Sequence, residues 1–250
     1  MQTRTIALAT ILTMLGSLGV SAGPTPAYTS TDALDLLMAG NVRFVSGMPE
    51  HRNTGSGRIA ETSAGQSPFA VVLTCADSRV PAELIFDRGI GDIFVVRVAG
   101  NTSGPVQAGS VEYAVEHLGS PLIVVMGHSA CGAVKAAASG NEAHGNIGAL
   151  LAPIAPAIAE ARASADPTSA DGFTQTAVRC NVLRSMSDLI SCSPAIAARV
   201  ESGDVRLVGA VYDLSSGRVE WLGQHPKQAD IIGRAKEVGL EPAATEHAEA

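Results

Sequence analysis

The stretch Val71–Arg79 reads VVLTCADSR, and a second stretch of similar design, Val124–Gly132, reads VVMGHSACG. Each begins with a short aliphatic run and stops at a turn that carries Cys or His. Such runs, bounded by turns, are typical of strands buried in a parallel sheet, and in open α/β sheets the chemistry lies just beyond the carboxyl ends of the strands. The sequence therefore predicts that the polar side chains of both turns meet at one edge of the sheet. They are Cys75, Asp77, Arg79, His128 and Cys131.

Apolar periodicity predicts strands that alternate with helices along most of the chain. The expected strands are 69–74, 93–98, 122–126, 205–212 and 219–222. The expected helices are 31–46, 81–87, 106–118, 132–138, 147–163 (broken or kinked at Pro153 and Pro156), 173–190, 194–200 and 228–238. A polar connection, 47–65, follows the first helix. This order is typical of an α/β fold with a mainly parallel central sheet, about four parallel strands plus an antiparallel edge strand, flanked by helices.

The first 22 residues have the pattern of a signal peptide. Arg4 supplies the positive charge, residues 5–20 are apolar, and Val20-Ser21-Ala22 provides small residues for cleavage after Ala22. An uncleaved N-terminal anchor is the alternative. We expect a disordered leader at 23–30, a single α/β domain at 31–240 and a disordered acidic tail at 241–250. The mature protein is then periplasmic or secreted and is not associated with a membrane.

The charge of the chain argues against two classes of partner. The formal net charge is −7, and the sequence contains no cluster of Lys or Arg. Nucleic acids and anionic membrane surfaces attract basic patches, so neither is an expected partner.

Four cysteines in an exported protein would ordinarily suggest two disulfides. Cys180 and Cys192 fall within or beside one predicted helix, where twelve residues span roughly 18 Å, beyond disulfide reach. We expect these two to be free and mostly buried thiols. A Cys75–Cys131 disulfide with an ordinary Asp77–Arg79 salt bridge would instead make the chain a binding or scaffold protein, but it leaves His128 without a role.

The same turns offer the ligands of a metal. Two thiolates, one imidazole and one carboxylate form a tetrahedral zinc set, and sites of the Cys₂His type with one open position are catalytic. About fifty residues separate C-x-D-x-R from H-x-x-C, as a crossover between parallel strands requires. Each pair alone is a weak signal, whereas both at strand ends favour a zinc centre.

A serine hydrolase is a second enzymatic interpretation. VVMGHSACG is also a strand, turn and helix with a serine, and Asp213 and His225 follow in the order of an α/β-hydrolase triad. The nucleophile elbow requires G-x-S-x-G, however, and Cys131 occupies the place of the second glycine. This interpretation also leaves C-x-D-x-R unexplained.

From about Asn41 to Leu222 the chain closely resembles the β-class carbonic anhydrases. The resemblance is carried by GNVRF, GQSP, TCADSRVP, VVRVAGN, EYAVEHLG, GHSACGAV and VGAVYDLSSGRVEWL. It implies one Zn²⁺ per chain, with Cys75, His128 and Cys131 as permanent ligands. Asp77 is the fourth ligand in a closed form, or pairs with Arg79 in an open form.

The resemblance also implies the reaction, which is reversible hydration of CO₂ to bicarbonate and a proton by zinc-bound hydroxide. Asp77 and Arg79 would be catalytic. The implied substrate pocket, partly shared across a dimer interface, consists of Gln66, Phe94, Ala99, Tyr113 and Gly132. The alternative for Phe94 and Tyr113 is ordinary core. A homodimer or a dimer of dimers is expected. Some relatives hydrolyse carbon disulfide or carbonyl sulfide on a similar site, which the motifs leave open.

Overall fold

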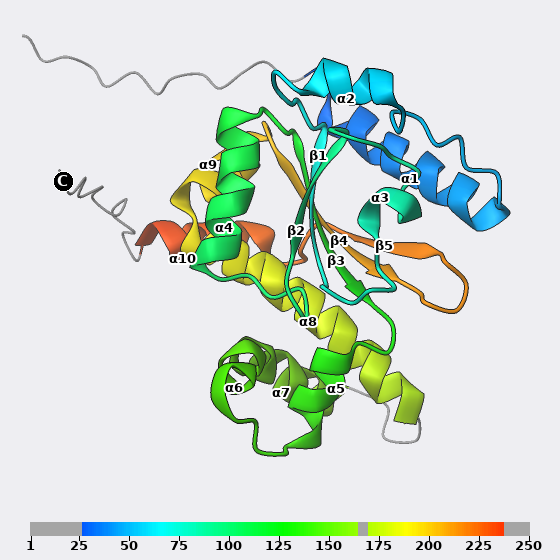
Figure 1. The fold of residues 1–250 in the computed structure, drawn as a ribbon. Helices are drawn as coiled ribbons and strands as arrows, with labels where there is room; N and C mark the ends of the chain where they lie inside the picture. Colours follow the sequence, from blue (N-terminus) through cyan, green and yellow to red (C-terminus); the bar gives the residue numbers. More distant parts are fainter. Residues whose placement is uncertain (1–26, 165–169, 238–250) are drawn as a thin grey trace, which may run out of the picture.

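The computed structural model describes residues 27–164 and 170–237, and its centre is one five-stranded sheet in the order β2-β1-β3-β4-β5 (Figure 1). The strands are β1 (Ala70–Thr74), β2 (Ile93–Arg97), β3 (Leu122–His128), β4 (Arg206–Tyr212) and β5 (Val219–Gly223). The first four pair in parallel, and β5 pairs with β4 in antiparallel fashion. The predicted fold class is therefore confirmed.

The strands β1 and β3 consist of aliphatic runs and do not alternate between apolar and polar residues. All five residues of β1 and all seven of β3 are buried, because helices cover both faces of the sheet. The register sets Thr74 beside Met126, so β1 ends close to the end of β3. The turns that follow these strands therefore leave the sheet at the same edge.

The helices form a layer on each face and a third group beyond the carboxyl edge. They are α1 (Ser30–Ser46), α2 (Ser56–Thr62), α3 (Ala82–Ile85), α4 (Pro105–Glu112), the π-helix η1 (Tyr113–His117), α5 (Gly132–Ser139), α6 (Gly145–Leu151), the 3₁₀-helix η2 (Ala152–Ile154), α7 (Ala155–Ser164), α8 (Ala170–Cys192), α9 (Pro194–Ser202) and α10 (Gln228–Glu237).

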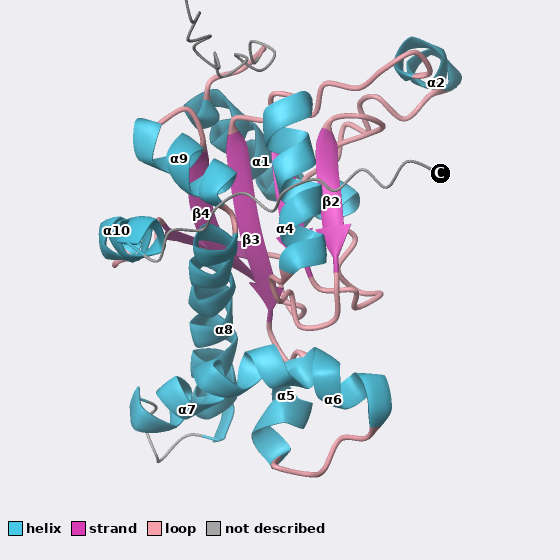
Figure 2. Ribbon diagram, turned by 90° about the vertical axis from the view of Figure 1, so that its left-hand side faces the viewer, coloured by secondary structure: helices cyan, strands magenta, loops and turns pink. Residues whose placement is uncertain are grey.

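Alternate residues of the strands divide the core between the two faces. Val71 and Leu73 pack with α4, α8, α9 and α10, whereas Val72 packs with α1 and α3. Figure 2 shows α5, α6 and α7 beyond the arrowheads of the strands, where the first part of α8 joins them. The helix α8 therefore packs on the sheet and also on the helices at its carboxyl edge.

Several predicted boundaries differ from the observed ones. The helix α1 begins at Ser30, one residue earlier than expected, and Thr29 is its N-cap: the Thr29 hydroxyl accepts from Asp32 N–H, and the Asp32 carboxylate accepts from Thr29 N–H. The end of the predicted leader thus belongs to the folded part. The connection 47–65 contains α2, β3 continues two residues further than expected, and the predicted helix 106–118 ends as η1.

The proline-containing segment breaks as predicted, since η2 includes Pro153 and separates α6 from α7. The predicted signal peptide and acidic tail lie outside the described residues. Within 27–164 and 170–237, no helix has both the length and the apolar character needed to cross a membrane.

Candidate metal centre

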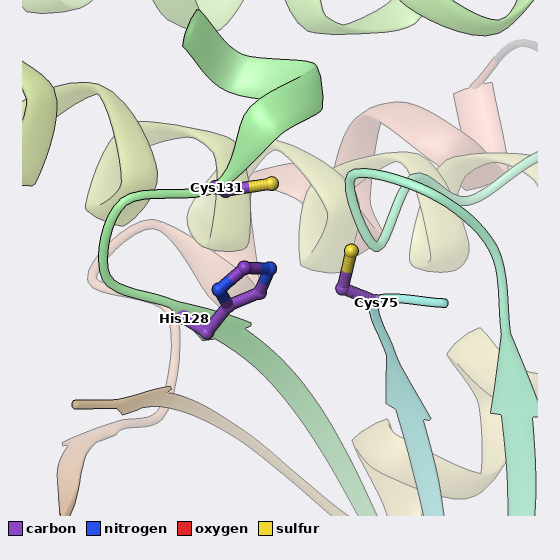
Figure 3. Close-up of side chains that lie close together, drawn as sticks. All are labelled: Cys75, His128 and Cys131. Carbon is purple, nitrogen blue, oxygen red and sulfur yellow. The ribbon is translucent and has the colours of Figure 1, made fainter. Parts of the chain in front are cut away.

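The three candidate metal ligands come from the ends of two neighbouring strands. Cys75 directly follows β1, His128 is the last residue of β3, and Cys131 is the N-cap residue of α5. Their ligand atoms all lie within 4.8 Å of one another, and all three residues are buried. Figure 3 shows both thiols and the imidazole directed into one common space. The predicted convergence of Cys75, His128 and Cys131 is therefore observed.

The turn between His128 and Cys131 depends on an unusual backbone conformation. Ala130 has φ +54°, in the left-handed region that side chains with a Cβ rarely adopt. Ser129 fixes the turn further, since its N–H donates to Tyr212 O and its hydroxyl accepts from Leu214 N–H. The strained turn is thus held by bonds to the end of β4 and to the loop that follows it, and Cys131 is turned back toward Cys75.

The thiols of Cys75 and Cys131 have pKa values that are shifted in opposite directions. Cys131 hydrogen-bonds to Cys75 and lowers the pKa of the Cys75 thiol, and His128 and the N–H groups of Gly100 and Asp77 lower it further against the effect of burial. The pKa of Cys131 is raised, first by Cys75 and then by burial. Gly100 N–H and Asp77 N–H donate to the Cys75 sulfur over 3.3 Å and 3.4 Å. One thiolate is therefore already favoured, and a cation would displace the remaining proton.

The imidazole of His128 is oriented as a ligand. Its Nδ1 lies 2.9 Å from Ser129 O, a carbonyl that can only accept, so Nδ1 carries the proton of the neutral ring. The lone pair is then on Nε2, which is buried and has no hydrogen-bond partner in the described part of the chain. A buried nitrogen acceptor without a donor, beside two sulfurs, is the donor set that zinc prefers. The residues present therefore fit a zinc ion.

Asp77 is held beside this set by Arg79. The guanidinium donates through Nε to Oδ1 at 2.9 Å and through Nη2 to Oδ2 at 2.7 Å, and Arg79 N–H donates to Oδ1 at 2.9 Å. These bonds keep the pKa of the Asp77 carboxyl far below its usual range. Asp77 Oδ2 lies 3.8 Å from His128 Nε2. The carboxylate is thus ionised, close to the ligands, and bound to the arginine.

A second arginine fixes the loop itself. Arg97, the last residue of β2, donates through Nε to Cys75 O at 3.1 Å and through Nη2 to Asp77 O at 2.6 Å. The C-x-D-x-R turn is therefore tied to the neighbouring strand, and its side chains keep their directions.

Comparison with known proteins identifies the family. A family profile described as carbonic anhydrase matches residues 70–219, which include both ligand turns and the whole sheet as far as the start of β5. The chain belongs to the carbonic anhydrase family. Carbonic anhydrase 2 of Mycobacterium tuberculosis is 41% identical over 186 residues, which are 73% of this chain and 87% of that protein.

Solved structures place the fold in the β class of carbonic anhydrases. The tetrameric β-carbonic anhydrases of Sordaria macrospora match with a TM-score of 0.59 and 25% identity, over 77% of this chain and 98% of the matched one. The Coccomyxa β-carbonic anhydrase in complex with acetazolamide matches in fold with a TM-score of 0.65 and 23% identity, over 84% and 95%. The resemblance stated from the sequence motifs is therefore confirmed.

The residues predicted to line the carbonic anhydrase pocket lie on several elements. Phe94 on β2 and Tyr113 at the start of η1 have ring centroids 6.3 Å apart. Tyr113 is 49% exposed, so it is not an ordinary core residue. Gln66 precedes β1 with its side chain exposed, Ala99 is partly buried, and Gly132 begins α5. Their role as a pocket stays a prediction.

The two rival interpretations of the sequence find little support. Cys75 and Cys131 are free thiols, and Ser129 bonds to backbone groups. His225 is engaged elsewhere: Lys227 N–H donates to Nδ1 at 3.0 Å, and Nε2 lies 3.2 Å from Ser187 Oγ. Since Ser187 donates its own proton to Leu183 O, Nε2 is the donor to Ser187.

The other two cysteines also lack disulfides. Cys180 and Cys192 are both free, as predicted from their position in one helix. Cys180 is buried, but Cys192 is exposed at the last residue of α8, so the expectation of two mostly buried thiols is wrong for Cys192.

Besides Arg97, which holds the turn of Cys75 and Asp77, two residues of this candidate metal centre were not expected from the sequence. Gly100 supplies an N–H to Cys75, and Asn181 on α8 holds Gly100 through its carbonyl at 2.7 Å. Gly100 has φ +80°, and a Cβ there would lie 2.7 Å from Ile154 Cδ1. A glycine directly after the VVRVA run was the available signal. No local pattern marks Asn181.

Proposed function

We propose that this member of the family catalyses reversible hydration of CO₂ to bicarbonate and a proton, with one Zn²⁺ held by Cys75, His128 and Cys131. The proposal rests on one observation, the buried Cys₂His set whose His128 Nε2 has no hydrogen-bond partner among the described residues. When bound, zinc supplies a Lewis acid that makes water a nucleophile at neutral pH. Two thiolates balance the charge of the ion, so the site then carries no net charge at its centre.

Asp77 and Arg79 would control the open position of the site. With both oxygens bonded to Arg79, the carboxylate stays off the ligand set. Its Oδ2 accepts one bond from Arg79 and keeps a lone pair that can accept a hydrogen bond from the reacting water and so orient that water. The low pKa of Asp77 keeps this acceptor ionised at neutral pH.

The reactants are small, and the proposed pocket suits them. Phe94 and Tyr113 offer apolar surface to CO₂, the amide of Gln66 offers a donor to bicarbonate, and Ala99 adds no bulk. Gly132 begins the eight-residue α5, where a backbone N–H can face an anion. The exposure of Gln66 and Tyr113 in one chain supports a pocket that a second subunit completes. We therefore include a homodimer or a dimer of dimers in the proposal.

Export to the periplasm or the medium is part of the same proposal and rests on the signal-peptide pattern of residues 1–22. Amino-terminal sequencing of the mature protein should begin at Gly23. Light scattering of that protein should give a mass of two or four chains. A mature protein that starts at Met1 would contradict export, and a monomer would contradict the shared pocket.

A stopped-flow assay of CO₂ hydration on the zinc-loaded mature chain, run across pH, tests the reaction. We expect activity that rises with pH, depends on one zinc per chain, and disappears on chelation. Carbon disulfide and carbonyl sulfide serve as comparison substrates in the same experiment. Zinc-loaded protein without CO₂ hydration, or full activity after complete removal of metal, would refute the proposal.

A further inference from the structure

A buried asparagine far along the chain contacts the loop that serves Cys75. Asn181 lies in α8 and is 1% exposed. Its Nδ2 donates to Gly100 O at 2.7 Å, across 81 residues of sequence, and the same nitrogen lies 3.5 Å from Asn101 Oδ1. On its other side Gly100 donates its N–H to the Cys75 sulfur at 3.3 Å. A continuous chain of hydrogen bonds therefore connects α8 with a metal ligand.

The backbone of Gly100 depends on hydrogen bonds to its neighbours for a fixed conformation. Glycine has the largest conformational freedom of any residue, so its own backbone preferences do not fix where its N–H points. A residue with a more restricted backbone cannot take the place of Gly100, because its Cβ would meet Ile154 and Ala133. The turn bond from Asn101 N–H to Val98 O encloses Ala99 and Gly100 and holds the amide side of the peptide group between Gly100 and Asn101. The carbonyl of Gly100 itself is held by Asn181.

The remaining polar atom of Asn181 argues that this bond is more than a packing detail. Its Oδ1 is buried and has no hydrogen-bond partner in the residues that the structure describes. An unpaired buried acceptor is unfavourable, because it has lost its hydrogen bonds to water. Natural proteins usually satisfy such atoms, and the exceptions are concentrated at functional sites. An apolar residue of similar size would avoid this cost, but it could not donate to Gly100.

We infer that Asn181 is a positioning residue for the metal centre, which holds Gly100 so that its N–H points at the Cys75 sulfur. This inference rests on the proposed zinc function. Groups that hydrogen-bond to a ligand orient it and tune its donor strength, and their loss typically lowers metal affinity about 10–100-fold. Asn181 acts one step further out, through Gly100, so we expect the lower end of that range.

The test compares Asn181→Leu and Asn181→Ala with the wild type and with Ser185→Ala. Leucine keeps the approximate size without a donor, and alanine removes both polar atoms of the side chain without adding bulk. Ser185 lies one turn further along α8 and is similarly buried, at 2% exposure, so it controls for loss of a buried polar group from this helix. Circular dichroism verifies folding, and the Ala variant carries the test should the Leu variant not fold.

Two readouts separate positioning from general structure: zinc affinity by competition with a chelator, and the sulfur-to-metal charge-transfer band of the cobalt(II)-substituted protein. Both Asn181 variants should bind zinc about tenfold more weakly. Their cobalt band should move to longer wavelength, since a thiolate without its N–H donor gives up an electron more easily. Ser185→Ala should match the wild type in both measurements.

Wild-type affinity and an unshifted cobalt band in a folded Asn181 variant would overturn the inference and leave the proposed function intact. An equal change in Ser185→Ala would also overturn it, because the effect would then be general to α8. A wild-type chain that binds neither zinc nor cobalt would overturn the proposed function and this inference together.

Discussion

Replacing Gly100 by alanine should destabilise the protein through two separable effects. The backbone of Gly100 has φ +80°, and a residue with a Cβ in this left-handed region loses about 1–2 kcal/mol. The added methyl would lie 2.7 Å from Ile154 Cδ1 and 3.1 Å from Ala133 Cβ. Ile154 is fully buried and Ala133 Cβ is fixed to the backbone of α5, so neither can retreat freely. Such overpacking costs about 1–3 kcal/mol more.

Urea unfolding of the chelator-treated protein measures the total loss of unfolding free energy in Gly100→Ala, with the single tryptophan, Trp221, as the fluorescent probe. The matched control is Gly203→Ala. Gly203 has nearly the same φ, +82°, but no atom of the described residues lies within 4 Å of the place that an added methyl group would take, so this variant should show the conformational cost alone. The difference between the two variants is therefore the steric cost at the metal centre. Equal losses of unfolding free energy in both variants would refute the reasoning about Ile154 and Ala133.

Three further predictions concern the site and the response to pH. Arg79→Ala frees the Asp77 carboxylate, which can then occupy the open ligand position, so CO₂ hydration should fall about a hundredfold; high activity in stopped flow would remove Arg79 from the mechanism. Cys75→Ser removes one thiolate, so zinc content by metal analysis should fall well below one per chain, and an unchanged content would exclude Cys75 as a ligand. Burial lowers the pKa of His225, so the folded protein binds fewer protons than the unfolded chain below the ordinary histidine pKa of about 6.5. The contribution of neutral His225 to the free energy of unfolding should therefore be fully present above that pH and be lost as the pH falls below it. The urea midpoint of His225→Gln should then depend less on pH than that of the wild type; equal slopes of urea midpoint against pH would contradict this.

The sequence predicted the parts of the structure that depend on local pattern. Aliphatic runs in β1 and β3 indicated buried parallel strands, and the turns after them indicated where Cys75, His128 and Cys131 would converge. Parallel strands that lie side by side bring their carboxyl ends together, so two motifs about fifty residues apart could be joined by topology alone.

What the sequence could not predict depends on contacts between distant segments. The π-helix η1 continues the apolar pattern of α4, so periodicity does not distinguish it from α-helix. The true N-cap Thr29 and the nearby Thr31 are both good capping residues, and only the bonds to Asp32 decide between them. Asn181 reaches Gly100 across the fold, and nothing in its neighbours along the chain marks that contact.

The spacing of the ligands along the chain has a consequence for how folding and metal supply are linked. His128 and Cys131 are close in sequence, so an unfolded chain could offer both to an ion at little entropic cost. Recruiting Cys75 would close a loop of about fifty residues, which costs about 3.5 kcal/mol in chain entropy. An ion bound by all three residues, as proposed, would therefore favour the native state, and resistance to denaturation should increase with the logarithm of free zinc once this exceeds the dissociation constant. The melting temperature of the protein would thus report the zinc concentration around it.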